Sequence, residues 1–227
     1  DVDLSGTPMS LLKGNRLFEK VFYGLFYNCT GIKNVSADFL PATTLEDYCY
    51  AYMFEGCTSL TTAPELPATT LADDCYHSMF EGCTSLTTAP ELPATTIAIA
   101  NYCYYYMFYN CTSLTTAPSI LPATMLANYC YSHMFENCTS LTIAPELPAT
   151  TLVDSCYSYM FRGCSKLNYI KMLATDIPAS NCLYGWVDGV ALYGTFMKNI
   201  DATWNITGSN GIPSGWEVQA VDPSIGG

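Results

Sequence analysis

The chain has 227 residues, of which 50% are hydrophobic and 12% charged, so it can bury a sizeable core. Its formal net charge of -12 would repel phosphate backbones and anionic lipid over most of the surface, and we expect no nucleic-acid partner. No run approaches the ~18 apolar residues of a membrane helix, and no secretory leader begins the sequence, so we expect a chain that was processed or cut from something longer.

Residues 1–20 precede any repeated pattern, and we expect them to form an N-terminal cap. Two strings then alternate along residues 21–190. The first is the nine-residue string CYxxMFxxC, which begins at Cys49, Cys75, Cys103, Cys130 and Cys156, with degenerate copies from Val21 and Cys182. The second is CTSLTTAPELPATT, which begins at Cys57 and recurs with small changes from Cys83, Cys111 and Cys138. We expect residues 191–227 to form a C-terminal cap.

Seven copies thus occupy residues 21–190, with a period of about 26–28 residues. The nine-residue string keeps its length, and the variation falls in the segment before its first cysteine. That segment is therefore interpreted as a tolerant loop, and the nine-residue string as the rigid part. A unit of this size cannot bury an apolar face alone, so stacked copies must form the core of one continuous structural domain.

Within a copy, Leu71, Cys75, Met79 and Cys83 are spaced by four, which predicts a short helix or helical turn. The residues from Leu60 to Ala63 suit a short parallel strand that pairs with its neighbours. The predicted fold class is an α/β solenoid. It is a leucine-rich-repeat-like right-handed coil, with short parallel strands on one face and short helices or helical turns on the other.

The arrangement FxxCxxL followed by LP, seen from Phe80 to Leu86 and at Leu92-Pro93, resembles the bacterial BspA-like leucine-rich repeats. The tail from GTFMKN to GIPSGWEV is similar to the C-terminal cap of gut Bacteroidetes members. The resemblance implies a curved solenoid on the cell surface or outer membrane, often made as a lipid-anchored precursor. It also implies, as partners, host matrix proteins or bacterial surface proteins.

Twelve cysteines in an extracellular protein would usually indicate disulfides. If the nine-residue string were helical, its two cysteines would lie about 12 Å apart along the axis, too far for a bridge. The cysteines form two columns through the stack, and we interpret them as buried free thiols that act as small apolar residues. Their spacing also differs from that of zinc sites, which begin with two closely spaced cysteines.

No catalytic pattern stands out, and we predict neither an enzyme nor a cofactor or metal. The two histidines, His77 and His133, occupy different places in their repeats, and the chain lacks GxSxG, HExxH and Gly-rich phosphate loops. Recurring carboxylates such as Glu65, Glu91 and Glu146 could in principle bind calcium. The spacing of a calcium loop is absent, so they are interpreted as a solvated edge.

Two rows of side chains are candidates for a ligand surface. Stacked tyrosines and a threonine-rich face suit sugars or protein partners, although the tyrosines could instead seal the core. The candidate residues are Tyr50, Tyr76, Tyr104, Tyr131, Tyr157, Thr61, Thr87, Thr115 and Thr142.

The sequence therefore predicts a non-enzymatic recognition or adhesion module at the cell surface that binds host or bacterial proteins. Because fold does not fix function, two alternatives stay open. One is a structural spacer that displays another part of a larger surface protein. The other is an accessory protein that binds a polysaccharide.

Overall fold

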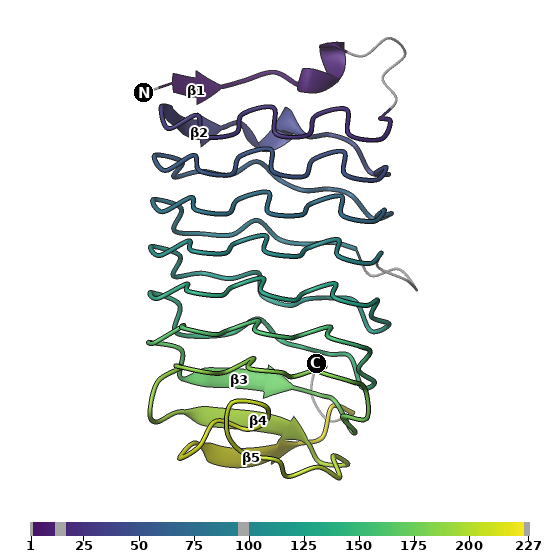
Figure 1. The fold of residues 1–227 in the computed structure, drawn as a ribbon, viewed down its shortest axis with the longest axis vertical. Helices are drawn as coiled ribbons and strands as arrows, with labels where there is room; N and C mark the ends of the chain where they lie inside the picture. The colour runs from purple at the N-terminus through teal and green to yellow at the C-terminus, as the bar shows by residue number, and fades with distance from the viewer. Residues whose placement is uncertain (1, 12–16, 95–99, 225–227) are drawn as a thin grey trace.

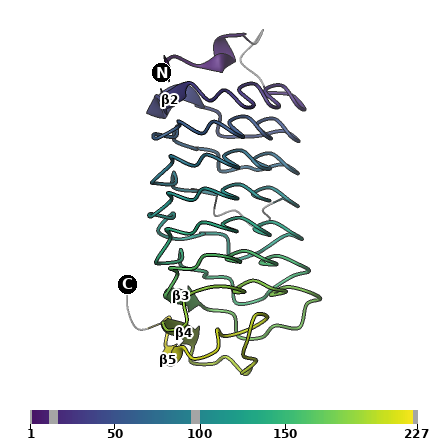
Figure 2. The same ribbon diagram turned by 60° about the vertical axis from the view of Figure 1, so that its left-hand side comes forward.

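The computed structural model describes residues 2–11, 17–94 and 100–224. The chain winds into a stack of parallel coils, with the N-terminus at one end and the C-terminal strands at the other (Figures 1 and 2). We number the coils by their nine-residue segments. Coils 1 to 7 contain residues 21–29, 49–57, 75–83, 103–111, 130–138, 156–164 and 182–190. This arrangement confirms the solenoid that the repeats predict.

Regular secondary structure is concentrated at the two ends of the stack. Five strands, all paired in parallel, and two short 3-10 helices are found in the described residues. At the N-terminal end they are β1 (Val2–Leu4), η1 (Pro8–Leu11), β2 (Ile32–Val35) and η2 (Ala37–Phe39). At the C-terminal end they are β3 (Tyr169–Met172), β4 (Thr195–Asn199) and β5 (Glu217–Val221). Strand β1 pairs with β2, and the second sheet has the order β3-β4-β5.

The nine-residue segments are not helical, and the prediction of short helices on one face of the coil is wrong for the described residues. In coil 3 the backbone φ is positive at Asp74, Ser78 and Gly82, four residues apart. The same spacing recurs in every coil. Three left-handed residues in so short a stretch are incompatible with a right-handed α-helix, which needs negative φ throughout. An apolar spacing of four fits either structure, so the spacing alone could not separate them.

Each nine-residue segment is instead a chain of tight turns, which we call the turn ribbon. Along coil 3, alternate N–H groups close turns onto the carbonyl three residues earlier, as from Met79 to Tyr76 at 3.2 Å. The N–H groups between them point along the stack, as from Phe80 to the carbonyl of Met107 in coil 4 at 2.9 Å. Because these two kinds of bond interleave, adding or deleting one residue would disrupt the pairing with the next coil. This explains why the segment keeps its length.

The second sequence string forms the strand side of the coils, where segments of coils 1 and 2, 3 and 4, and 5 and 6 pair in parallel through isolated bridges. Examples are Asn34 with Thr62, Thr88 with Thr116 and Ile143 with Tyr169. The parallel strands that the sequence predicts are therefore confirmed, although in the middle of the stack they are too short to form a continuous sheet.

The core consists of columns of identical side chains that repeat from coil to coil. Phenylalanines including Phe54, Phe80 and Phe108 stack with ring centroids 5.6 to 5.7 Å apart and are fully buried. Methionines such as Met79 lie beside them, also fully buried. A stacked column maximises contact between flat rings of equal size, and every coil contributes the same apolar area to it.

All twelve cysteines are free thiols, and eleven of them are buried, as we interpreted them. The cysteines that end the nine-residue segments, such as Cys83 and Cys111, also have a polar role. The thiol of Cys83 donates to the carbonyl of Phe54 in the preceding coil at 3.2 Å, and that of Cys111 to Phe80 at 3.1 Å. Burial raises the pKa of these thiols well above its ordinary value, which keeps them protonated and able to donate.

The C-terminal end of the stack is closed by indole donors. The ring N–H groups of Trp186, Trp204 and Trp216 each reach a backbone carbonyl 25 to 30 residues away, at 2.7 to 2.9 Å. The side chain of Asn210 accepts from the N–H of Gly185 at 2.7 Å, taking the place of a further coil. These bonds satisfy backbone groups that the last coil would otherwise leave exposed.

Candidate functional site

The tyrosine column lies inside the stack, so its predicted place on a ligand surface is wrong. The five tyrosines that follow the first cysteine are at most 1% exposed, and their rings stack 5.4 to 6.0 Å apart. They seal the core, which is the alternative the sequence left open. They are Tyr50, Tyr76, Tyr104, Tyr131 and Tyr157.

The threonine row faces outward. Thr87, Thr115 and Thr142 are exposed, and Thr61 is half-buried. The hydroxyls of Thr61 and Thr115 donate to backbone carbonyls of the preceding coil at 3.1 Å, and the rest of these side chains faces solvent. The structure therefore separates the two candidate rows and leaves only the threonines accessible to a ligand.

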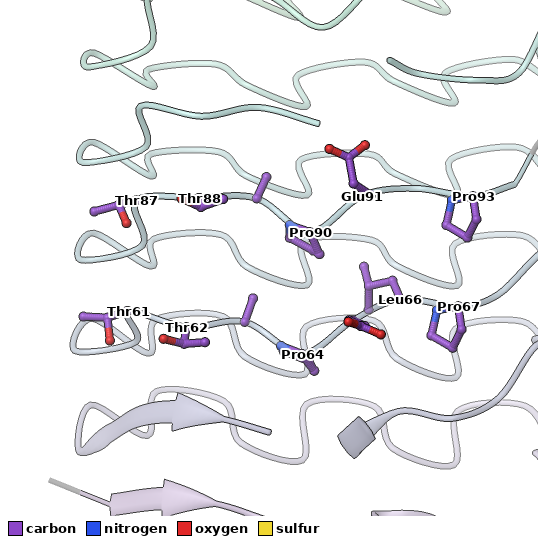
Figure 3. A pocket seen from close by; sticks show the side chains of 13 residues that line it. Thr61, Thr62, Pro64, Leu66, Pro67, Thr87, Thr88, Pro90, Glu91 and Pro93 are labelled. Carbon is purple, nitrogen blue, oxygen red and sulfur yellow. The ribbon is translucent and has the colours of Figure 1, made fainter. Parts of the chain in front are cut away.

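A groove of about 620 Å³ runs between the strand sides of coils 2 and 3, and we call it the Thr-Pro groove (Figure 3). Corresponding residues of the two coils line its two sides, so each side carries a threonine pair, two prolines and a glutamate. Those shown in Figure 3 include Thr61, Thr62, Pro64, Pro67, Thr87, Thr88, Pro90, Glu91 and Pro93.

The groove coincides with a gap in the strand pairing. The bond from Val35 to Thr62 joins coils 1 and 2, and that from Ala89 to Thr116 joins coils 3 and 4. Among the described residues, no corresponding backbone bond joins residues 61–63 to residues 87–89, and the equivalent residues 115–117 and 142–144 of coils 4 and 5 also lack one. The N–H groups of Thr87 and Thr88 are therefore available to an incoming acceptor, as at the edge of a sheet.

The prolines end each strand segment but do not explain the gap, because coils 3 and 4 pair although Pro90 and Pro118 lie at the same place. Pro64 and Pro90 have no N–H to donate, and each follows directly after the short strand segment of its coil. Both coils carry an exposed carboxylate beside these prolines. Glu65 faces solvent, while Glu91 accepts hydrogen bonds from the N–H and hydroxyl of Ser119 at 3.0 Å. The groove is thus lined by rigid apolar rings, hydroxyls and negative charge.

The outer surface of the turn ribbon carries a row of tyrosine and histidine rings, which the sequence only partly revealed. We call it the outer row. The rings lie 4.3 to 5.5 Å apart from one coil to the next. Its members are Tyr23, Tyr52, His77, Tyr105, Tyr106, His133, Tyr159 and Tyr184. Both histidines belong to it, although their different places in the repeat hid this relation.

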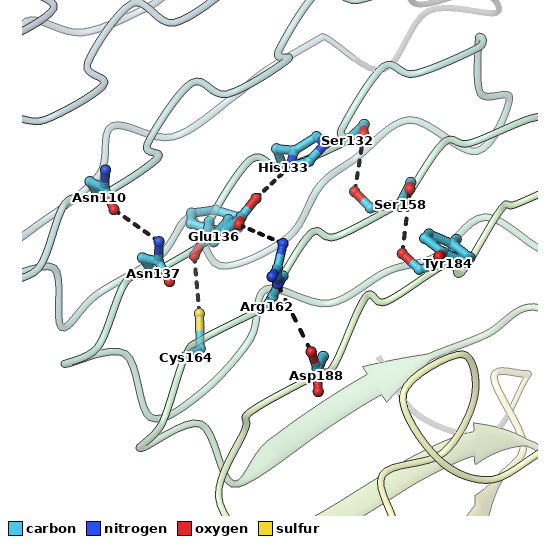
Figure 4. A network of polar contacts seen from close by, with 11 residues as sticks. Asn110, Ser132, His133, Glu136, Asn137, Ser158, Arg162, Cys164, Tyr184 and Asp188 are labelled. Atoms are coloured by element: carbon cyan, nitrogen blue, oxygen red, sulfur yellow. Dashed lines mark hydrogen bonds and ion pairs between the residues drawn. The ribbon is translucent and has the colours of Figure 1, made fainter.

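Polar contacts beside the outer row join coils 5 to 7 (Figure 4). The His133 ring contacts the buried carboxylate of Glu136, and Arg162 reaches that carboxylate at 3.6 Å and Asp188 at 3.9 Å. The hydroxyl of Ser132 donates to the carbonyl of Ser158 at 3.0 Å. A buried carboxylate needs such partners, so we interpret this network as structural.

The described residues contain no group of three or more His, Cys, Asp or Glu side chains placed to hold a metal ion. In the same part of the chain, no helix is long and apolar enough to span a membrane.

The central coils are similar in sequence to a family of repeats. Residues 75–182 match the family model described as the BspA type leucine rich repeat region, in six copies. The search of curated proteins returned no match. Among solved structures, the leucine-rich repeat protein of T. pallidum is similar, with 20% identity and a TM-score of 0.40. That match covers 79% of this chain and 65% of the T. pallidum chain.

Proposed function

Residues 75–182 carry leucine-rich repeats of the BspA type, a kind of repeat that generally binds proteins, and we propose that this chain is a non-enzymatic protein-recognition module. The Thr-Pro groove is its binding site, and its partner contributes an extended polypeptide segment with a basic side chain. We also propose a place on the cell surface, where the partner would be a host matrix protein or a bacterial surface protein.

The observation that carries this proposal is the groove that lies at the unpaired junction between coils 2 and 3. The N–H groups of Thr87 and Thr88 and the carbonyl of Thr61 form no backbone bond across the groove. An extended segment could satisfy these groups with its own backbone, which is how peptides add to sheet edges. The fixed rings of Pro67, Pro90 and Pro93 offer apolar surface with little entropy to lose.

Charge favours a basic segment. Glu65 and Glu91 line the groove, and the whole chain carries a formal charge of -12. Such a field speeds the approach of a cationic partner and would make the association rate fall as salt is added. A neutral glycan would not show this dependence.

The experiment is binding of the purified chain to a panel of matrix proteins and polysaccharides. The groove variant replaces Thr61 and Thr87 with lysine. The matched control replaces Thr124 and Thr151 with lysine, because these two threonines are exposed elsewhere on the coil. We expect saturable binding to a protein that is lost in the groove variant, kept in the control and weakened by salt. Binding to a polysaccharide alone would indicate the accessory role, and binding to nothing on the panel would favour the spacer.

A further inference from the structure

A second cavity, of about 490 Å³, lies on the turn ribbon of coils 1 and 2, on a different part of the coil from the Thr-Pro groove. It is lined by Tyr23, Gly24, Tyr27, Tyr52 and Glu55. Three aromatic side chains and one carboxylate thus surround a glycine.

The cavity lies beside Gly24, at a place where coils 2, 4, 5 and 6 carry a ring and coil 3 carries Ser78. The place occupied by Gly24 is held in coils 2, 4 and 6 by Tyr52, Tyr106 and Tyr159, all with the same left-handed backbone, at φ of 55 to 59°. A Cβ added to Gly24 would contact only the Cβ of Tyr27, at 3.7 Å. The backbone of Gly24 is therefore open to the cavity.

Coil 7 also has glycine at this place, and there the space is filled. A Cβ added to Gly185 would meet the ring of Tyr159 at 2.8 Å. The glycine in coil 7 thus makes room for a ring from the preceding coil. Gly24 has no such ring against it within the described residues, so the two ends of the outer row differ in whether this space is occupied.

The walls of the cavity suit a positive charge with alkyl groups around it. Tyr23 and Tyr27 are 50% and 52% exposed, and the rings of Tyr23 and Tyr52 lie 5.0 Å apart at an angle of 53°. Non-parallel ring faces around one space attract a cation through their π-systems, and such cages are how proteins hold quaternary ammonium groups.

Nearby carboxylates add charge complementarity. Glu55 lines the cavity, and Glu81 follows it in the next coil. Burial, and to a smaller extent the neighbouring Glu81, raises the pKa of Glu55 to about 7. A bound cation would relieve this repulsion and favour the ionised form of Glu55. A neutral ring would leave the repulsion in place.

We propose that the cavity between Tyr23, Tyr27, Tyr52 and Glu55 binds an alkylammonium group of the choline class. The proposal is independent of the protein-binding role of the Thr-Pro groove. It places a small organic cation beside Gly24, next to the ring of Tyr23 that ends the outer row.

The test is titration of the purified chain with choline, followed by NMR of the choline methyl groups. Neohexanol, in which carbon replaces the charged nitrogen, is the matched neutral probe. The Gly24→Tyr variant fills the cavity with the side chain of the other coils, and Tyr27→Ala removes one wall. Tyr184→Ala, which removes a tyrosine of similar exposure from the opposite end of the row, is the control.

We expect saturable choline binding that is lost in Gly24→Tyr, weakened roughly fivefold in Tyr27→Ala and unchanged in Tyr184→Ala. Coils 2, 4 and 6 carry tyrosine at this place, so we expect the Gly24→Tyr variant to fold. An unchanged thermal transition would confirm that it does. Equal binding of neohexanol, binding that survives Gly24→Tyr, or no binding of choline at tens of millimolar would each overturn the proposal.

Discussion

The turn ribbon and the strand side are built from the same number of coils, yet they are held together differently. In the turn ribbon, backbone bonds run from coil to coil along the stack, as from Tyr50 to Cys75 and from Tyr76 to Cys103. On the strand side, pairing between coils 2 and 3 is missing at residues 61–63 and 87–89. The turn ribbon thus holds the coils together, and the strand side can leave backbone groups without hydrogen bonds.

The difference between the turn ribbon and the strand side shows where a solenoid of this kind can accommodate a binding site. Pairing that is complete on one side already sets the spacing between coils, so the other side need not be paired to keep the coils aligned. The Thr-Pro groove lies on the less constrained side. The predictions that follow test this division of roles, starting with the largest expected effect.

Hydrogen exchange should separate the two sides most clearly. The amides of Tyr76, Ser78 and Phe80 are bonded to coil 4, and we expect their protection to approach the global free energy of unfolding, about 5 kcal/mol or more. The amides of Thr87 and Thr88 should exchange almost as fast as in an unfolded chain. Residue-resolved exchange by NMR measures both. Strong protection at Thr87 and Thr88 would show that the groove is closed in solution.

Truncating the core of the turn ribbon should be the most damaging single change. Phe80 is fully buried and stacks between two other phenylalanines, so Phe80→Ala is expected to lower the free energy of unfolding by about 3 to 5 kcal/mol. Phe18, which is 58% exposed, is the matched control, and Phe18→Ala should be close to neutral. Chemical denaturation compares them. A near-neutral Phe80→Ala would mean that this column does not form the core.

The cysteine thiols that end the nine-residue segments should contribute to stability only where they are buried and hydrogen-bonded. Cys83→Ala removes a donor to the Phe54 carbonyl and leaves a small void, at an expected cost of about 1 to 2 kcal/mol. Cys29 has the corresponding place in coil 1 but is exposed, so Cys29→Ala should cost little. Equal losses for the two variants in thermal unfolding would argue against a role for the hydrogen bond.

The buried tyrosine column should tolerate the loss of a hydroxyl. The hydroxyl of Tyr131 is buried without a partner among the described residues, and burial raises its pKa well above the usual value. Coil 1 has Phe22 at the corresponding place. We therefore expect Tyr131→Phe to be neutral or to stabilise the fold by up to about 1 kcal/mol. A clear loss of stability on denaturation would reveal a hydrogen bond that this geometry lacks.

The smallest expected effect concerns Glu55 and its dependence on pH. Its carboxyl pKa is about 7 in the folded chain, against an unfolded value of about 4.3, so the protonated form favours the folded state. This contribution is full below about pH 4.3 and is lost as the pH rises through about 7. Solvent screening limits it to about 0.5 kcal/mol. Glu55→Gln should be slightly more stable than the parent at pH 8 and equal at pH 4, measured by denaturation at both values.

Several features of the fold could be predicted from particular residues. The columns that contain Phe80 and Cys83 are interior, as their repetition predicted, and the residues around Thr88 form a short parallel pair with coil 4. The helix prediction failed although a signal against it was present. The last left-handed position of every nine-residue segment is Gly or Asn, the residues that adopt positive φ at least cost.

The candidate site was predicted only in part. Threonines such as Thr61 and Thr87 line the Thr-Pro groove, but the groove itself depends on a bond that is absent between two coils, and no residue pattern marks an absence of that kind. Thr88 pairs with the following coil and not with the preceding one, although the CTSLTTAP string is the same in coils 2, 3 and 4.

The sequence by itself determined the stack: its period, its apolar columns and the short strands, because repeated apolar residues can be buried only by repeated neighbours. The tertiary structure decided whether a spacing of four meant helix or turns, because the N–H groups of Tyr76 and Phe80 find their acceptors in the next coil. It also decided which tyrosines are buried and which line a cavity, since Tyr50 and Tyr52 differ only in the direction the ribbon gives them.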